Sequence, residues 1–410
     1  MSAEPPKLSA QLLLDYLVEL GTALMSAGCP TNRLEDLLVA IAQQEGFTAD
    51  IFAVPTGLFI SLRTPTGEPP LVNMVRVREW KNDLHRLAEL DAMLNEVADR
   101  TLGIPEARAR IHEREHRKPV WPLWAMLLAS VGASAGSAIS FGGSVIDCAV
   151  AGVGGLLLRV MMVSTRNDPS LRLLENFLGG LIAGVVALFA TQAIPGTSRE
   201  VLVLATIIPL LPGLTLTTGL SEVAWRHLVA GSARLMQAAV TLLSLVFGIA
   251  LVVGLEGRLH FPVPASGVHD AAPWFFQLVA LPVAALSYGV SLGLSRKDLS
   301  IALGSGALVW LISAAGRSLP GSHAAFISAF VLSAAANIYA RNAGRPAQLF
   351  LMPGMLLLVP GALSYRSLET LLRGDVVTSA SQAGEMLIIA GALVMGLLVS
   401  SVVIPARKYL

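Results

Sequence analysis

The stretch IIPLLPGLTLTTG, residues 207–219, interrupts an apolar segment with two prolines and a glycine. A second stretch, FLMPGMLLLVPGAL at residues 350–363, interrupts another apolar segment with two Pro-Gly pairs. Because proline removes a backbone N–H and clashes with the preceding turn, a membrane helix that contains it leaves backbone groups for protein or water to satisfy. Interruptions at corresponding places of two halves indicate the binding site of a transporter. The residues expected to line a substrate path are Pro212, Gly213, Pro360 and Gly361.

The alternative interpretation of these prolines is that they only kink helices so that neighbouring helices pack. The composition of the chain indicates that these prolines lie in segments surrounded by lipid. The chain has 410 residues, of which 54% are hydrophobic and 14% charged, too apolar for an ordinary soluble protein. This composition predicts a polytopic α-helical membrane protein whose partner is the lipid bilayer. The formal net charge is only +1, so the chain has no excess of positive charge for binding nucleic acid.

No catalytic or cofactor-binding pattern stands out along the chain. The two cysteines, Cys29 and Cys148, lack the spacing of a disulfide framework or a metal site. His85 is a candidate base, but no nucleophile motif, metal motif or phosphate-binding loop accompanies it. We therefore expect no enzyme activity, no catalytic residue, no metal and no cofactor.

Residues 1–118 contain most of the charge and predict a small soluble α+β domain. Apolar residues at helical spacing predict helices over residues 8–27 and 82–100. Asn32 and Glu35 resemble a capping box that starts another helix, which continues to about residue 45. The expected strands are 47–54, 58–64 and 71–77, separated by turn residues.

Ten apolar segments follow, each roughly 20 residues long and therefore able to cross a bilayer. They lie near residues 121–141, 145–163, 173–194, 200–219, 232–255, 273–293, 299–316, 324–342, 346–365 and 382–404. With the amino terminus inside, most basic loop residues fall in inner loops, which favours both termini in the cytoplasm. The expected outer loops contain only Arg199, Arg258, Arg317, Arg366 and Arg373.

The ten segments divide into two sets of five, residues 119–256 and 257–410. At an offset of 151 residues, Asp147 aligns with Asp298, and several glycines, serines and alanines around them also align. An odd number of spans in each repeat inverts the second repeat relative to the first. The sequence therefore predicts two inverted five-helix repeats, with a substrate path near the midplane between them.

Ionisable residues within the spans are candidates for transport, because a charge in a bilayer is costly and tends to face a pathway or a partner. Asp147 and Asp298, near opposite ends of the second and seventh spans, are the candidate proton carriers; alternatively each caps its span. Arg159 either extends to the surface or pairs with a carboxylate. Glu175, which begins the third span, could be that partner or could mark the interface. The neutral candidates for the path are Asn337 and Tyr288, which could instead only join helices.

Several motifs together resemble the bacterial threonine/serine exporter family, as a fused form of the two-subunit membrane exporters. The second half of that family's signature is similar to Arg345-Pro346 followed by residues 350–354 and 358–361. Its first half is similar to Phe141-Gly142-Gly143-Ser144 with Asp147. The soluble domain is similar at Ser26-Ala27-Gly28 with Thr31, Arg33 and Glu35, at Pro55-Thr56, at Arg76-Val77, and at Asn82 with Leu84-His85-Arg86-Leu87.

The resemblance implies a ten-span exporter of threonine or serine in the bacterial cytoplasmic membrane, driven by the proton motive force. Its expected partners are a small-molecule substrate and protons, and the sequence leaves homo-oligomerisation open. Small dicarboxylates such as succinate are the alternative substrates. A membrane-anchored enzyme or sensor that acts through residues 1–118 is the alternative from another functional class.

Overall fold

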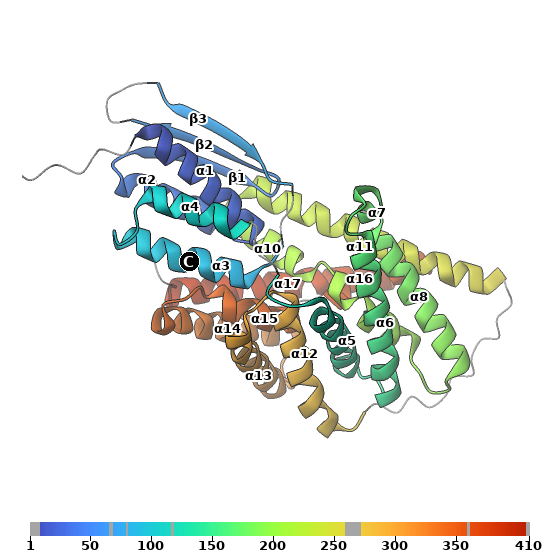
Figure 1. The fold of residues 1–410 in the computed structure, drawn as a ribbon. Helices are drawn as coiled ribbons and strands as arrows, with labels where there is room; N and C mark the ends of the chain where they lie inside the picture. The colour runs from blue at the N-terminus through green and yellow to red at the C-terminus, as the bar shows by residue number, and fades with distance from the viewer. Residues whose placement is uncertain are drawn as a thin grey trace, which may run out of the picture.

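The computed structural model describes residues 9–64, 69–78, 81–115, 119–258, 272–358 and 361–406. It consists of a front unit, formed by the elements from α1 to α4, and a larger helical body (Figure 1). The front unit comprises α1 (Ala10–Ser26), α2 (Thr31–Gln44), β1 (Thr48–Val54), β2 (Gly57–Arg63), β3 (Leu71–Arg76), α3 (Leu84–Ala98) and α4 (Ile104–Glu115). The α+β character that the sequence predicts for this part is confirmed.

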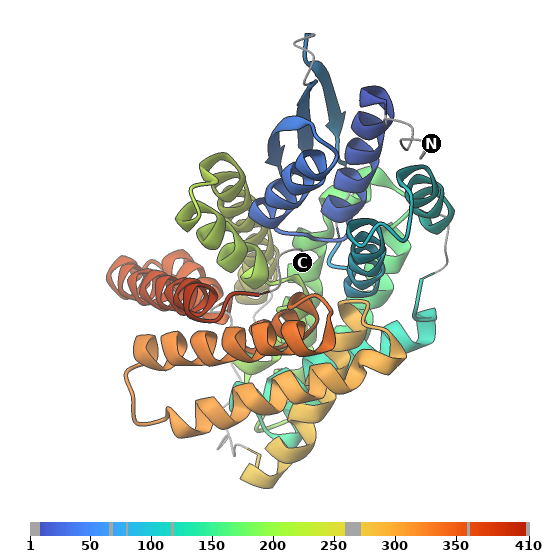
Figure 2. The same cartoon turned by 90° about the vertical axis from the view of Figure 1, so that its left-hand side faces the viewer.

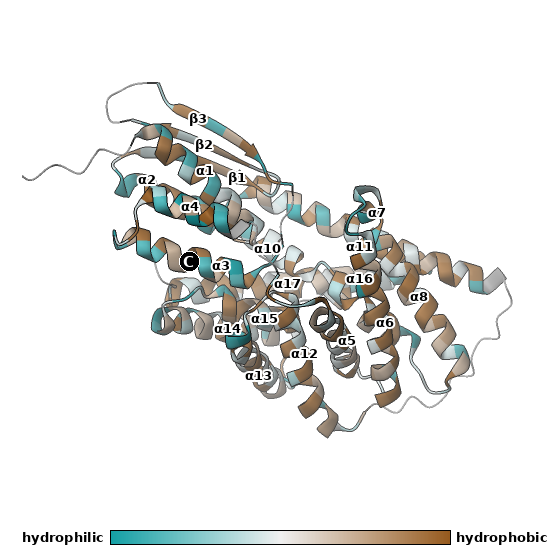
Figure 3. Ribbon diagram, viewed as in Figure 1, coloured by the Kyte–Doolittle hydropathy of each residue, from teal (hydrophilic) through white to brown (hydrophobic). Residues whose placement is uncertain are grey.

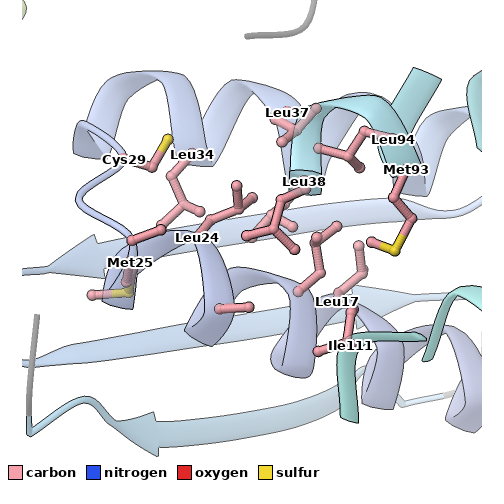
Figure 4. Packing of buried hydrophobic residues seen from close by; sticks show 14 of the residues in the cluster. Leu17, Leu24, Met25, Cys29, Leu34, Leu37, Leu38, Met93, Leu94 and Ile111 are labelled. Carbon is pink, nitrogen blue, oxygen red and sulfur yellow. The ribbon is translucent and has the colours of Figure 1, made fainter. Parts of the chain in front are cut away.

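The sheet of the front unit is an antiparallel meander in the order β1-β2-β3. Alternation along β2 buries Leu58, Ile60 and Leu62, whereas Phe59 between them is exposed. Helices α1 and α2 pack on the sheet, and α1 also contacts α4. The core contains side chains from all four helices, among them Leu17, Leu24, Leu38, Met93, Leu94 and Ile111 (Figure 4).

The predicted capping box at the start of α2 is wrong. Pro30 is the N-cap residue, and it provides no side-chain hydrogen bond. Asn32 therefore lies inside the helix, and Glu35 turns to the sheet, where its Oε1 accepts a hydrogen bond from the Ala53 N–H at 2.7 Å. An N-cap residue has extended backbone, which proline adopts readily, as the ψ of 143° at Pro30 shows, but proline has no side-chain oxygen to accept a hydrogen bond.

The helical body contains a first set of helices up to Arg258 and a second set from Gln277. The first set is α5 (Leu123–Ser140), α6 (Val145–Thr165), α7 (Pro169–Leu173), α8 (Glu175–Ala193), α9 (Arg199–Ile207), η1 (Ile208–Leu210), α10 (Gly213–Ala224) and α11 (Leu228–Arg258). The second is α12 (Gln277–Ser291), α13 (Leu299–Ala315), α14 (Gly321–Ala343), α15 (Gln348–Leu358), α16 (Gly361–Leu372) and α17 (Val376–Val403), with η2 (Trp274–Phe276) before α12 and η3 (Arg296–Asp298) before α13.

Within the described residues, eight helical segments are long and apolar enough to cross a membrane, and a bent pair raises the number to nine. The bent pair is Arg199–Leu210 with Gly213–Ala224, which meet at 58°. The predicted span 273–293 corresponds to α12, which has only 15 residues because η2 precedes it. The chain is thus a multi-pass membrane protein, whereas ten spans remain a prediction. Apolar side chains dominate the outward faces of the body (Figure 3).

Helix contacts in the two sets correspond. Helix α8 packs against α11 as α14 packs against α17, and α10 packs against α11 as α16 packs against α17. Contacts between the sets correspond as well, because α10 touches α17 and α16 touches α11. A Cβ on Gly248 would meet the Phe177 carbonyl oxygen at 2.3 Å, and a Cβ on Gly396 would meet the Phe326 carbonyl oxygen at 2.5 Å. The same close backbone contact therefore occurs in each set.

The front unit lies against one side of the helical body (Figure 2). The Leu84 N–H donates to the Leu292 carbonyl oxygen at 2.9 Å, and the Trp121 indole N–H donates to that of Leu294 at 2.7 Å. Both carbonyl groups belong to the loop between α12 and α13. The Arg341 guanidinium donates to the carbonyl oxygen of Pro405, near the last described residue, at 2.7 Å.

Candidate transport site between the two halves

The two broken segments meet inside the helical body. Helix α10 begins at Gly213 after Pro212, and α16 begins at Gly361. A Cβ on Gly361 would lie 3.4 Å from the Leu211 Cβ and 3.8 Å from the Gly213 Cα. The structure thus brings residues of the two predicted interruptions together, although they belong to separate halves of the chain. Pro360 was part of the predicted path, but it lies outside the described residues.

Tyr288 lies where α12 packs against α5, and it is 5% exposed. Its hydroxyl shares a hydrogen bond of 2.7 Å with the Ser137 hydroxyl. The phenol ring packs in a cluster with Ala133 and Ala284, which Ile208 and Leu357 border. Tyr288 therefore joins two helices close to both breaks, and its predicted contact with substrate remains a prediction.

Asn337 in α14 lies in a different environment. Its side-chain amide is 3% exposed and donates to the Ile404 carbonyl oxygen at 2.7 Å, beyond the last turn of α17. A carbonyl at a helix end has no partner within its helix, so this bond satisfies a group that would otherwise be unpaired. The contact favours the helix-joining alternative for Asn337.

Two buried hydroxyl groups near Tyr288 were missed in the sequence. Ser134 in α5 and Thr206 in α9 are fully buried, and neither hydroxyl has a hydrogen-bond partner among the described residues. A Cβ on Gly155 would lie 2.4 Å from the Ser134 Oγ, and one on Gly154 would lie 2.4 Å from the Thr206 Oγ1. The sequence feature that indicates these two buried hydroxyl groups is the Gly154-Gly155 pair in α6, because adjacent small residues let polar groups of neighbouring helices approach.

Asp147 forms the capping box of α6 and is fully buried. Its Oδ2 accepts hydrogen bonds from the Ser144 N–H and hydroxyl, both at 2.8 Å. Its Oδ1 accepts a hydrogen bond from the Ser198 N–H at 3.0 Å, just before α9. The carboxylate therefore connects the start of α6 to the start of the first broken segment.

Asp298 makes a corresponding connection at the other end of the body. It forms a two-bond ion pair with the Arg345 guanidinium, in the loop before α15, and accepts a hydrogen bond from the Ser295 hydroxyl at 2.7 Å. Helix α5, whose 18 residues span about 27 Å, leads from the front-unit side towards Asp147. The two aspartates thus lie at opposite ends, and their role in proton transfer remains a prediction.

Arg159 and Glu175, for which a charge pair was one of the alternatives, do not form an ion pair in the described structure. The Glu175 carboxylate accepts a hydrogen bond from the Thr165 hydroxyl at 2.8 Å and thereby joins α6 to α8. The Arg159 Nε is buried and has no hydrogen-bond partner among the described residues. An interfacial position for Glu175 is consistent with this contact, and Arg159 remains a candidate for the path.

A polar contact connects the front unit to the end of α10. The Glu222 carboxylate, 1% exposed, accepts hydrogen bonds from the Arg234 Nε at 2.9 Å and from the Thr31 N–H at 3.3 Å. Beside it, His227 lies 3.4 Å from the Glu35 carboxylate. The first turn of α2 thus obtains its acceptor from a helix of the body. Sequence reasoning missed Glu222, because its partners are distant in the chain.

Glu35 gives this contact a predictable pH dependence, because burial raises the pKa of its carboxyl. A raised pKa means that the folded chain binds the proton more tightly, so this contribution to stability is complete below pH 4.5 and is lost as the pH rises through the raised pKa. Glu35→Gln removes the titration. The melting temperature of the wild-type protein is therefore expected to fall relative to that of Glu35→Gln as the pH increases from 4.5.

Thermal unfolding in detergent across a pH series measures this difference. Glu45→Gln, the same substitution at the C-cap of α2, serves as the control and should follow the wild-type curve. A difference between the wild-type protein and Glu35→Gln that stays constant with pH would contradict the assignment.

A cavity of about 310 Å³ lies between α5, α12, α13 and α15, towards the ends of α5 and α13 that point away from the front unit. Its polar lining is Ser140, Gln277, Ser313 and Arg317, and its apolar lining includes Val309, Trp310 and Leu357. Among the described residues no group of His, Cys, Asp and Glu side chains is arranged to bind a metal ion.

The sequence matches two family models in succession. A model described as threonine/serine exporter matches residues 15–255, and one described as Threonine/Serine exporter, ThrE, matches residues 277–403. A relative from Mycobacterium tuberculosis, named "Probable threonine/serine exporter", is 26% identical over 288 residues, which are 68% of this chain and 54% of the relative.

Relatives from Eremothecium gossypii and Kluyveromyces lactis are both named "Pheromone-regulated membrane protein 10". Each is 26% identical and covers 86% of this chain, but the match covers 48% and 38% of their own lengths. The chain thus spans about half the length of the curated relatives it matches. No solved structure matches it. Because the first family model alone covers more than half of the chain and the second covers most of the rest, the chain belongs to the threonine/serine exporter family of membrane exporters, which are not enzymes.

Proposed function

We propose that the protein is a secondary active exporter of small polar metabolites, with threonine and serine as substrates and the proton motive force as the energy source. The observation that supports this most is the meeting of α10 and α16 at Gly213 and Gly361. The amino-terminal end of a helix has free N–H groups and a partial positive charge, both of which favour an anion. The amino-terminal end of α10 at Gly213, which lies next to Gly361 of the second half, suits the carboxylate of an amino acid.

We infer that the two halves are inverted repeats that move against each other in alternating access. The corresponding helix contacts support this, as do positions of equal conformation at the offset of 151 residues. Gly142 and Gly293 both have positive φ, at 80° and 73°, and the Ser144 and Ser295 hydroxyls each contact the aspartate three residues on. A broken helix in each repeat then contributes one wall of a path near the midplane.

The positive-inside distribution supports a cytoplasmic front unit, with the carboxyl end on the same side, in a bacterial cytoplasmic membrane. In this orientation the Asp298–Arg345 ion pair closes the cytoplasmic end of the path, and the cavity near Arg317 faces outward. Export then requires the ion pair to separate when the cytoplasmic end opens.

Counterflow in proteoliposomes tests the proposed function. Vesicles that contain the purified protein are loaded with unlabelled serine, and uptake of labelled serine, threonine or succinate is followed with and without a pH gradient. Uptake of serine and threonine is expected, and a preference for succinate would instead assign dicarboxylates as substrates. A lack of uptake of all three compounds would exclude this substrate class.

Asp147→Asn and Asp298→Asn are expected to abolish gradient-driven transport while exchange without a gradient is largely kept. Asp147 is the N3 residue of the capping box and accepts hydrogen bonds on both oxygens, of which asparagine keeps only one. The transport result at this position is therefore assigned to proton transfer only if the melting temperature of Asp147→Asn in detergent stays close to that of the wild-type protein. Asp375→Asn is the matched control, because Asp375 caps α17 in an exposed position. Gradient-driven rates equal to those of the wild-type protein would assign both aspartates to structure alone.

A further inference from the structure

The cavity on the side opposite the front unit has an asymmetric lining. Its polar groups come from α5, α12 and the end of α13: the Ser140 and Ser313 hydroxyls, the Gln277 amide and the Arg317 guanidinium. Val309, Trp310 and Leu357 provide an apolar wall. At about 310 Å³ the cavity is at the small end of the range for ligand sites, and a few convergent polar groups on an apolar wall are typical of such sites.

Arg317 is the only side chain in this lining that has a permanent charge. No carboxylate of the described residues forms an ion pair with it. A guanidinium presents parallel N–H donors that match the two oxygens of a carboxylate, and its charge persists at every physiological pH. The adjacent Gln277 amide oxygen and the serine hydroxyls can accept hydrogen bonds from an ammonium group. Together these groups complement a small zwitterion.

Leu357 connects this cavity to the predicted path. It lines the cavity, and it also borders the cluster that contains Tyr288 and that Ile208 of the first broken segment contacts. One leucine side chain thus lies between the cavity and the place where the two halves meet. A substrate that leaves this place towards the outer face would pass the cavity next.

We propose that this cavity is a release site, in which Arg317 binds the carboxylate of the exported amino acid before it leaves the protein. This inference rests on the proposed function. Arg317 is then a binding residue that affects the affinity of the outer face for substrate.

Exchange driven from the outer face tests the release site. Proteoliposomes with the front unit inside are exposed to external serine, and the half-saturating concentration is measured. Loss of hydrogen bonds to a charged group in Arg317→Gln is expected to raise this concentration roughly 10- to 100-fold. Arg317→Lys, which keeps the charge without the paired donors, should give an intermediate value. Arg373→Gln, an exposed arginine on the same face, should behave like the wild-type protein.

Serinamide, which lacks the carboxylate, identifies the group that Arg317 binds. The wild-type protein should prefer serine to serinamide, and Arg317→Gln should lose most of this preference. The competing source of the same chemistry is an anionic lipid headgroup. If Arg317 binds such a headgroup, the effect of Arg317→Gln would appear only in vesicles containing phosphatidylglycerol and would be equal for serine and serinamide. This result would overturn the proposal.

A second measurement keeps Arg317 intact. In a Cys148→Ser background, Ser313→Cys is treated with a thiol reagent that bears a sulfonate group, and serine is expected to slow its reaction whereas serinamide is not. Equal reaction rates with and without serine, or unchanged kinetics in Arg317→Gln, would overturn the release site. If the wild-type protein exchanges no serine, threonine or succinate, the proposed function itself fails. If it exchanges serine but the tests on Arg317 and Ser313 fail, only the release site is excluded.

Discussion

Replacing Glu222 by glutamine is expected to loosen the front unit from the helical body. The carboxylate is buried, pairs with an Arg234 side chain that is only 11% exposed, and accepts the Thr31 N–H. The substitution removes the Glu222 charge from its ion pair with this guanidinium, and breaking a buried ion pair on one side costs up to about 3–5 kcal/mol. It also removes negative charge from the first turn of α2, where a helix favours an anion. The pair with Arg234 joins α10 to α11, and the bond from Thr31 joins the front unit to α10, so the substitution weakens both the end of α10 and its contact with α2.

Hydrogen exchange of the full protein in nanodiscs measures this effect. Amides in the first turn of α2 and the last turn of α10 should exchange faster in Glu222→Gln, while those of β2 should keep their protection. Asp50→Asn is the control, because it breaks an ion pair with Arg63 in which both side chains are 63% exposed, and such pairs contribute about 1 kcal/mol or less. Unchanged exchange in α2 would show that other contacts hold the front unit.

Gly248→Ala and Gly396→Ala are each expected to destabilise the helical body by about 1–3 kcal/mol or more, as overpacked cores are. In both cases the obstacle is a backbone carbonyl oxygen, of Phe177 in the first set and of Phe326 in the second, which cannot rotate away as a side chain could. The whole facing helix must shift. A gain of about 1 kcal/mol in helix propensity from glycine to alanine offsets only part of this.

Each of these variants has a matched control in its own helix. A Cβ on Gly254 in α11, or on Gly391 in α17, would meet nothing within 4 Å. Gly254→Ala and Gly391→Ala should therefore leave the melting temperature in detergent unchanged or slightly higher, while the two packing variants lower it. Similar melting temperatures for all four variants would contradict the close approach of α8 to α11 and of α14 to α17.

Features that depend on nearby residues could be predicted from the sequence. The three strands, most helices and the bend at Pro212 follow from periodicity and from proline and glycine, which act on their own backbone. The alignment at 151 residues pairs two Ser-x-x-Asp stretches, and in both the serine hydroxyl contacts the aspartate. Their helix starts differ, because Asp147 lies at the third position of α6 whereas Asp298 is the N-cap of α13.

Features that depend on distant partners could not be predicted in this way. Glu222 lies near the end of α10, yet its carboxylate accepts a hydrogen bond from the first residue of α2, 191 residues earlier in the chain. Ser134 and Thr206 have the sequence features of ordinary polar residues in membrane helices. Only the tertiary structure shows that they pack against Gly155 and Gly154 and that their hydroxyls have no hydrogen-bond partner among the described residues. Arg317 lies in an expected loop, and only the tertiary arrangement places it beside Gln277.

The contact between Ser137 and Tyr288 has a consequence for the origin of the two halves. These residues are 151 positions apart, so in the proposed repeat each is the counterpart of the other, and so are Gly132 and Val283, which also touch. A position that meets its own counterpart lies on the two-fold axis. In a dimer of identical five-helix chains it would pair only with itself, serine with serine or tyrosine with tyrosine. In the proposed repeat, two halves within one chain are not bound by this restriction, and the pair at the axis is a serine hydroxyl with a tyrosine hydroxyl.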